Sequence, residues 1–198
     1  MLKDIPTLFN DYLHEQNLCL EEILKNNSSI NNIIGILIDA RNSGKKIFTF
    51  GNGGSASTAS HFVSDLLKTT ITKDDKRFIA ISLVDNFAVN SAWANDVSYD
   101  DIFIEQLKNF LTDGDIVIAF SGSGTSINVT KALEYAKTKG AITIGFTGIP
   151  GGKFPKICDH SYLVPSNNML TIESFHIMIC HGIVFSIREL GDPIFKYE

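Results

Sequence analysis

The sequence predicts an α/β fold built on a parallel sheet. From residue 47 onward, apolar strand-like segments alternate with helix-like segments, a pattern typical of a parallel sheet with right-handed crossovers and helices on both faces. Two of the strand-like segments run directly into turns rich in glycine and serine, at 51–55 and 121–126. Because parallel strands end at the same edge of a sheet, these two turns are expected to converge.

Two amphipathic helices are predicted before the first strand. Apolar residues recur at helical spacing through 4–26 and again through 29–43, and Ser43-Gly44 is a helix-ending signal. The first 45 residues therefore form a predicted N-terminal helical hairpin, followed by an α/β core over 46–198. The pattern leaves open whether this hairpin packs across its own sheet or against a partner subunit.

The core is predicted to hold five parallel strands, each followed or preceded by a helix. The expected strands are 47–50, 78–83, 116–120, 141–146 and 161–164. The expected helices are 55–68, 87–94, 101–111, 126–138 and 171–190. No linker or low-complexity stretch divides the chain, so residues 1–198 are expected to form a single domain.

Composition excludes several classes of partner. The chain has 198 residues, 44% of them hydrophobic, and a net charge of −5, so one packed core is expected and no basic stripe is available for nucleic acid. The longest apolar runs are short or interrupted by polar residues, and the N-terminus is acidic, so neither a membrane span nor a signal peptide is expected. We therefore expect a cytoplasmic protein. The odd number of cysteines, Cys19, Cys158 and Cys180, predicts reduced thiols in or near the core.

The first turn predicts a phosphate site. Gly51-Asn52-Gly53-Gly54-Ser55 follows a buried strand, and its glycines let a ligand approach the main chain, while Ser55 is expected to cap the next helix. A helix N-terminus at such a turn favours an anion. The turn lacks both the GxGxxG spacing of dinucleotide sites and the lysine of a P-loop, so NAD and nucleoside triphosphates are disfavoured.

The second turn reinforces this interpretation. It combines two glycines with four hydroxyl side chains, Ser121, Ser123, Thr125 and Ser126. Hydroxyls and backbone N–H groups without a lysine suit the monoester phosphate of a small metabolite. A plain Ser/Gly loop is the alternative.

Two further groups of polar residues are candidates for chemistry. His61 and Asp65 are spaced i,i+4 and share one helix face, although a solvated surface pair would show the same spacing. Glu173, His176 and His181 lie in an otherwise apolar helical stretch. A lone histidine there would most often be a core residue, but two histidines and a carboxylate within nine positions indicate a site. Carboxylates and imidazoles bind Zn²⁺ or act as acid and base.

The spacing within the last helix constrains any shared metal site. Glu173 and His181 are eight residues apart, roughly 12 Å along a regular helix and too far to reach one metal ion easily. If both contribute to one site, they are predicted to come from different chains, so the site would lie at a subunit interface.

Several segments together resemble a known family. GNGGS, SHFVSDLL, SLVDNFAVNSAWANDVSY, FSGSGTSINVTKALEYAK and GFTGIPGGK occur in this order, followed by the helix with Glu173 and His181. Over nearly the whole chain this combination resembles the phosphoheptose isomerases of the sugar-isomerase (SIS) domain superfamily. The resemblance implies an SIS-type three-layer α/β/α sandwich and a homotetramer with zinc-containing active sites between subunits. It also implies conversion of sedoheptulose 7-phosphate to D-glycero-D-manno-heptose 7-phosphate, which feeds nucleotide-heptose and surface glycans such as lipopolysaccharide.

The resemblance also implies roles for individual residues. It places the metal ligands at His61, Asp65, Glu173 and His181, and the catalytic base and acid at Asp65 and His181. It places substrate contacts at Asn52, Gly53, Gly54, Ser55, Asp65, Asn95, Asp96, Ser121, Gly122, Ser123, Ser126 and Glu173.

This chain departs from the family pattern at three of its positions. Asp65 stands where a glutamate is usual, Glu173 where a glutamine is usual, and Thr69, beside Lys68, where a basic residue is common. Aspartate still binds zinc and accepts a proton, but its reach is shorter by about 1.3 to 1.5 Å, a displacement that can cost ~100-fold in rate.

The implied reaction is an aldose–ketose isomerisation through a cis-enediol, with no organic cofactor. Two alternatives stay open. One is a non-catalytic SIS scaffold of the DnaA initiator-associating type, and the other is an isomerase of another ketose phosphate, such as a hexulose or arabinose 5-phosphate. The retention of His61 and His181 beside acidic residues favours an enzyme.

Overall fold

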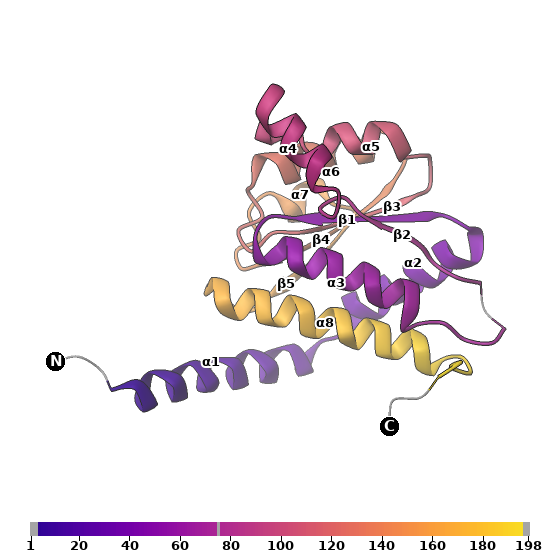
Figure 1. The fold of residues 1–198 in the computed structure, drawn as a ribbon. Helices are drawn as coiled ribbons and strands as arrows, with labels where there is room; N and C mark the ends of the chain where they lie inside the picture. The colour runs from indigo at the N-terminus through magenta and orange to yellow at the C-terminus, as the bar shows by residue number, and fades with distance from the viewer. Residues whose placement is uncertain (1–3, 75, 196–198) are drawn as a thin grey trace.

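A computed structural model describes residues 4–74 and 76–195 of the chain. Its centre is a five-stranded sheet in the order β2-β1-β3-β4-β5, and every neighbouring pair is parallel (Figure 1). This confirms the predicted parallel sheet. The strands are β1 (Lys46–Gly51), β2 (Ile79–Ser82), β3 (Ile116–Phe120), β4 (Ile142–Gly148) and β5 (His160–Val164).

Helices cover both faces of this sheet, which completes the predicted α/β/α sandwich. One face carries α2 (Ser28–Ser43), α3 (Gly54–Lys68) and α8 (Met169–Glu189), and the other carries α5 (Ile104–Phe110), α6 (Ile127–Thr138) and α7 (Phe154–Ile157) (Figure 1). Along β3, alternate side chains enter the two cores: Ile118 packs on the α3–α8 side and Val117 on the α6 side. The central strands are apolar almost throughout because both of their faces are buried.

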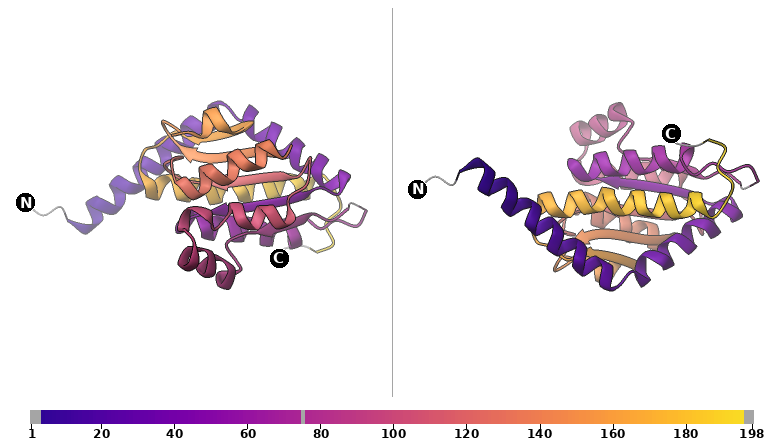
Figure 2. Two further views of the ribbon diagram at one scale, coloured as in Figure 1. Left: turned by 90° about the horizontal axis from the view of Figure 1, so that it is seen from above. Right: turned by 90° about the horizontal axis from the view of Figure 1, so that it is seen from below.

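The N-terminal helices differ in how they pack. The second, α2, buries Ile33 and Leu37 and ends at Gly44, whose φ of 69° gives the predicted C-terminal cap. The first, α1 (Ile5–Lys25), extends beyond the sandwich (Figure 2) and, among its residues, buries only Cys19. Its apolar residues are largely exposed, among them Ile5, Leu8, Phe9, Leu13, Leu18 and Leu24.

Three local predictions need correction. Ser55 does not cap α3: Gly53 occupies the N-cap position with φ 56°, and the buried Ser55 lies inside the helix. The helix expected over 101–111 is divided into a 3-10 turn, η1 (Tyr99–Asp101), and α5. The short helix α7 was not predicted, because four residues are too few to show a helical repeat of apolar positions. The remaining helix, α4 (Phe87–Asp96), lies beside η1.

The last helix, α8, is long and apolar enough in composition to cross a membrane. Half of its most apolar window is buried inside the fold, where it packs against α3 and the sheet. The place of α8 in the core therefore accounts for the buried half of its apolar residues.

All three cysteines are buried free thiols, as predicted. Burial raises the pKa of Cys158 to about 12 and that of Cys19 to about 11, so both thiols stay protonated at neutral pH.

Candidate active site

The two glycine-rich turns form one pocket. β1 pairs with β3 so that Gly51 lies opposite Phe120, and the residues that follow each strand therefore meet at the carboxyl edge of the sheet. Between them is a cavity of about 300 Å³. It is lined by Asn52, Gly53, Gly54, Ser55, Ser121, Gly122, Ser123, Ser126, Met169 and Glu173.

Three helices begin at this pocket. α3 starts at Gly54, α6 follows Ser126, and α8 starts at Met169, and all three of these residues line the cavity. Helix N-termini direct unpaired N–H groups and partial positive charge at their surroundings, so this pocket favours an anion. The hydroxyls of Ser121 and Ser126 lie 3.5 Å apart in the same wall and add donors.

The Glu173 carboxylate lies directly against the main chain at Gly54. A Cβ built there would lie 2.3 Å from Oε2 of Glu173. The absence of a side chain at Gly54 therefore leaves room for this carboxylate beside the first turn. Most of the predicted substrate-binding residues line this pocket, and the exceptions are Asp65, Asn95 and Asp96. Asn95 and Asp96 are exposed at the end of α4 and bond to each other.

A second polar group lies further along the same two helices. His61 and Asp65 on α3 face His181 on α8, and the three ligand atoms all lie within 4.8 Å of one another. The Nε2 atoms of the two histidines are 3.1 Å apart, and Oδ2 of Asp65 is 3.5 Å from Nε2 of His61 and 3.7 Å from Nε2 of His181. The two imidazoles are half exposed, at 51% and 52%, whereas Asp65 is only 18% exposed.

The spacing of these three atoms fits a metal ion. A tetrahedral Zn²⁺ with N and O ligands at about 2.0–2.2 Å needs donor atoms roughly 3.3 Å apart, close to the observed separations. Thr69 donates a hydrogen bond of 3.1 Å to Oδ1 of Asp65, which leaves Oδ2 directed at the imidazoles. His61, Asp65 and His181 therefore form a group that could hold a metal ion with one side open.

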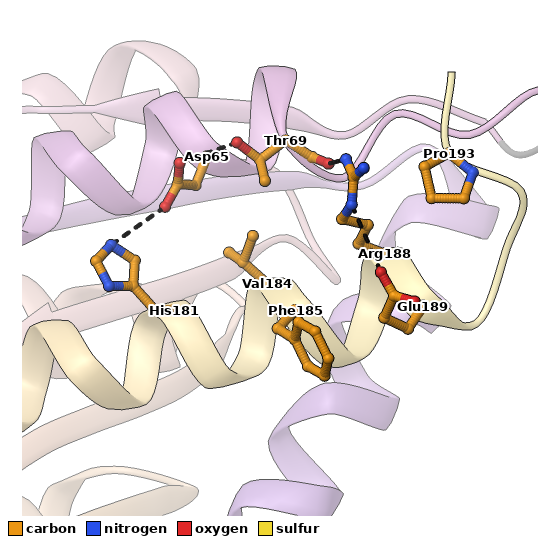
Figure 3. Close-up of a pocket in the computed structure, with 8 residues that line it drawn as sticks. All are labelled: Asp65, Thr69, His181, Val184, Phe185, Arg188, Glu189 and Pro193. Carbon is orange, nitrogen blue, oxygen red and sulfur yellow. Dashed lines mark hydrogen bonds and ion pairs between the residues drawn. The ribbon is translucent and has the colours of Figure 1, made fainter. Parts of the chain in front are cut away.

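A larger cavity of about 540 Å³ adjoins this group (Figure 3). Asp65, Thr69 and His181 line one end of it, and Arg188 and the C-terminal Pro193 line the other. The Arg188 guanidinium donates to the carbonyl of Thr69 at 3.2 Å, so it lies beside the residue that orients Asp65. A cavity of this size, bordered by an acid and an imidazole, is suited to a small polar ligand.

The two polar regions are separate within one chain. α3 and α8 lie side by side (Figure 2) and both begin at the glycine pocket. His61 is seven residues beyond Gly54, roughly 10 Å along the helix. Glu173 lies in the glycine pocket and is not part of the histidine–aspartate group among the described residues.

His176 belongs to neither region. The sequence grouped it with Glu173 and His181, but it is fully buried and packs against the stacked rings of Phe120 and Phe146. Burial lowers its pKa to about 4, so it is a neutral core residue.

Comparison with known proteins identifies the family of the chain. The SIS domain family matches residues 11–148. A probable phosphoheptose isomerase of Thermoplasma volcanium is 37% identical over 174 residues, which cover 88% of this chain and 87% of that protein. The chain belongs to the phosphoheptose isomerase family of SIS-domain proteins.

Two further members of the phosphoheptose isomerase family support this placement. The phosphoheptose isomerase of Clostridium acetobutylicum is 40% identical over 172 residues, covering 85% of this chain and 87% of that protein. The solved structure of a phosphoheptose isomerase from Francisella tularensis superposes with a TM-score of 0.88 at 26% identity, covering 94% of this chain and 100% of that one. The family and fold predicted from the sequence are confirmed.

Proposed function

We propose that this chain is a phosphoheptose isomerase that interconverts sedoheptulose 7-phosphate and D-glycero-D-manno-heptose 7-phosphate. The observation that carries the proposal is the presence of a pocket of about 300 Å³ at three helix N-termini together with an acid–imidazole group on two of the same helices. The names of the relatives supply the reaction class, an aldose–ketose isomerisation of a sugar phosphate.

In this proposal the glycine pocket holds the phosphate and the acid–imidazole group acts at the carbonyl end. Asp65 removes the proton from the hydroxyl-bearing carbon next to the carbonyl and returns it to the former carbonyl carbon. His181 gives a proton to the carbonyl oxygen and takes back the proton of the neighbouring hydroxyl, which becomes the new carbonyl. Reactant and product are isomers, so no electron or group leaves the sugar. Thr69 supports this role of Asp65 because it holds one carboxylate oxygen and leaves the other accessible.

We propose Zn²⁺ as the metal, held by His61, Asp65 and His181 of one chain. When bound, the ion supplies a Lewis acid that polarises the carbonyl and stabilises the enediolate. Glu173 is a metal ligand in this proposal only if it comes from a second copy, because in its own chain it lies in the glycine pocket, roughly two helical turns away. The active site would then combine the glycine pocket of one copy with the metal group of another.

This arrangement requires association of at least two copies, and we propose the homotetramer implied by the resemblance. The exposed apolar side chains of α1, and the hollow between Leu13, Leu20 and Met178, support burial against another subunit. We also propose a cytoplasmic location and a role in the synthesis of nucleotide-heptose for surface glycans, because both are expected of an enzyme that acts on phosphorylated heptoses.

The test is an assay of sedoheptulose 7-phosphate turnover before and after treatment with a chelator. We expect turnover, its loss on chelation, and its recovery when Zn²⁺ is restored. Turnover that survives complete removal of metal would contradict the zinc proposal. No turnover of this sugar by the metal-loaded protein would favour a scaffold or, if another ketose phosphate is converted, a different isomerase.

A further inference from the structure

Asn52, in the wall of the glycine pocket, is held by a hydrogen-bond network that fixes the direction of its side-chain amide. Its Nδ2 donates to Oδ1 of Asn128 at 3.0 Å, and Nδ2 of Asn128 donates back to Oδ1 of Asn52 at 2.9 Å. The hydroxyl of Tyr99 donates to the same Asn52 oxygen at 2.9 Å. The three residues come from the first turn, from α6 and from η1, so the contacts join separate parts of the chain.

A main-chain N–H group determines which atom donates in each hydrogen bond of the network. The backbone N–H of Val129 lies 3.0 Å from Oδ1 of Asn128. A backbone N–H can only donate, so the Asn128 atom that faces it must be the oxygen. The Asn128 amide nitrogen then faces Asn52 and donates, so the Asn52 atom that it contacts must be the side-chain oxygen. The Tyr99 hydroxyl contacts the same oxygen and must therefore be the donor.

The two supporting residues are held in different ways: Asn128 is buried, whereas Tyr99 is 54% exposed and is held through the short helix that carries it. Asn128 is 2% exposed at the start of α6. Tyr99 lies on η1, which is tied to α6 by the ion pair between Asp101 and Lys131 at 2.5 Å, and Ser98 caps η1 by accepting from the backbone of Asp100. The network is therefore built into the fold.

The consequence concerns what Asn52 offers to a ligand. Its oxygen already accepts two hydrogen bonds, and one hydrogen of Nδ2 is used by Asn128. Among the described residues nothing takes the second hydrogen, and Asn52 lines the pocket. We propose that Asn52 presents an N–H donor, and not a carbonyl acceptor, to an oxygen of the bound sugar phosphate, and that Tyr99 and Asn128 are positioning residues that set this polarity. This inference rests on the proposed function.

The kinetic test is a double-mutant cycle between Tyr99 and Asn52. Tyr99→Phe removes only the hydroxyl, and we expect KM for sedoheptulose 7-phosphate to rise about 3- to 10-fold with kcat and thermal stability retained. In an Asn52→Ala background the same change should have no further effect, because its target is gone. Tyr135→Phe, about two turns further along α6 from Asn128, is the matched control and should leave KM unchanged. An unchanged KM in Tyr99→Phe, or an undiminished effect in the Asn52→Ala background, overturns the inference.

A spectroscopic test separates this inference from the proposed function. Side-chain and backbone amide resonances are followed in ¹H–¹⁵N spectra while sedoheptulose 7-phosphate is added. We expect one Nδ2 proton of Asn52 to shift together with the backbone amides of Gly53 and Gly54. Shifts at these glycines with both Asn52 protons unmoved overturn the inference alone. If no pocket resonance shifts, the proposed function fails and the inference fails with it.

Discussion

The glycine pocket and the histidine–aspartate group lie on the same pair of helices but are built by different means. The pocket lies at turns fixed by the pairing of β1 with β3 and by three helix starts. The group is made of side chains from two neighbouring helices, with both imidazoles half exposed. The position of the pocket is thus set by strand pairing, whereas the geometry of the group depends on side-chain orientation.

This difference predicts separate roles for the glycine pocket and the histidine–aspartate group. A pocket at turns fixed by strand pairing and helix starts suits the phosphate, which does not change during the reaction, because its donors are positioned before the ligand arrives. The side-chain group can present a base, an acid and metal ligands, which must exchange protons. Changes in the group should therefore affect kcat, and changes in the pocket should affect KM.

The largest expected effect is in the histidine–aspartate group. Asp65→Asn keeps the shape of the side chain but removes the base, so we expect kcat to fall by about 10²- to 10⁴-fold while the protein stays folded. Sugar-phosphate binding, measured by calorimetry, should persist because the glycine pocket is untouched. Glu134→Gln, on the surface of α6, is the control and should change neither quantity. Turnover by Asp65→Asn within tenfold of the native rate would remove Asp65 from the chemistry.

A second change should act on the pocket alone. Ser126→Asp places a carboxylate beside the expected phosphate, and a repulsion of about 3 kcal/mol would raise KM roughly 100-fold with the metal content unchanged. Ser126→Asn introduces a side chain of nearly the same size as aspartate but without its charge. Comparing the two variants therefore isolates the electrostatic contribution to the change in KM. Equal KM values in the two variants would show that this pocket does not bind the phosphate.

The same contrast explains what the sequence could predict. The glycine pocket was predictable because a turn that follows a buried strand carries its own signal, in glycines and hydroxyls that are adjacent in the chain. His61 and Asp65 were predictable as a pair from their i,i+4 spacing, and His181 from a polar residue in an apolar helix together with the family resemblance.

Other features depend on the folded arrangement. Asn128 and Asn52 are 76 positions apart, and the hydroxyl of Tyr99 reaches Asn52 across 47, so no local pattern marks this network. His176 was misjudged because an inward and an outward histidine look alike within an apolar helix, and only its packing against Phe120 and Phe146 distinguishes them.

His176 provides a test of the core beneath the pocket. Its pKa is about 4 in the folded protein against 6.5 for the unperturbed side chain, so the unfolded chain binds the proton more readily. The contribution of neutral His176 to the free energy of unfolding should be fully present above pH 6.5. It should be lost as the pH drops toward 4, which lowers the free energy of unfolding by up to about 3 kcal/mol. Chemical denaturation at several pH values measures this.

The matched variant is His176→Leu, in which the loss of stability between pH 6.5 and 4 should largely disappear. Glu15 contributes acid sensitivity of its own, because hydrogen bonds from Asn168 and Thr171 lower its pKa. That contribution appears only as the pH falls below the usual glutamate value of 4.5, so it does not obscure the histidine. Parallel pH profiles of the variant and the native protein would contradict a buried neutral His176.

The smallest expected effect tests how the open group is oriented. Thr69→Val preserves the shape of the side chain but removes the 3.1 Å hydrogen bond to Oδ1 of Asp65. One such bond contributes about 1 kcal/mol, so we expect kcat to fall about 3- to 10-fold with KM unchanged. Thr138→Val, where the hydroxyl bonds to the carbonyl of Tyr135 on α6, is the control and should leave both constants unchanged. A rise in KM without loss of kcat would mean that Thr69 serves binding, and the separation of roles between the pocket and the group would not hold at this residue.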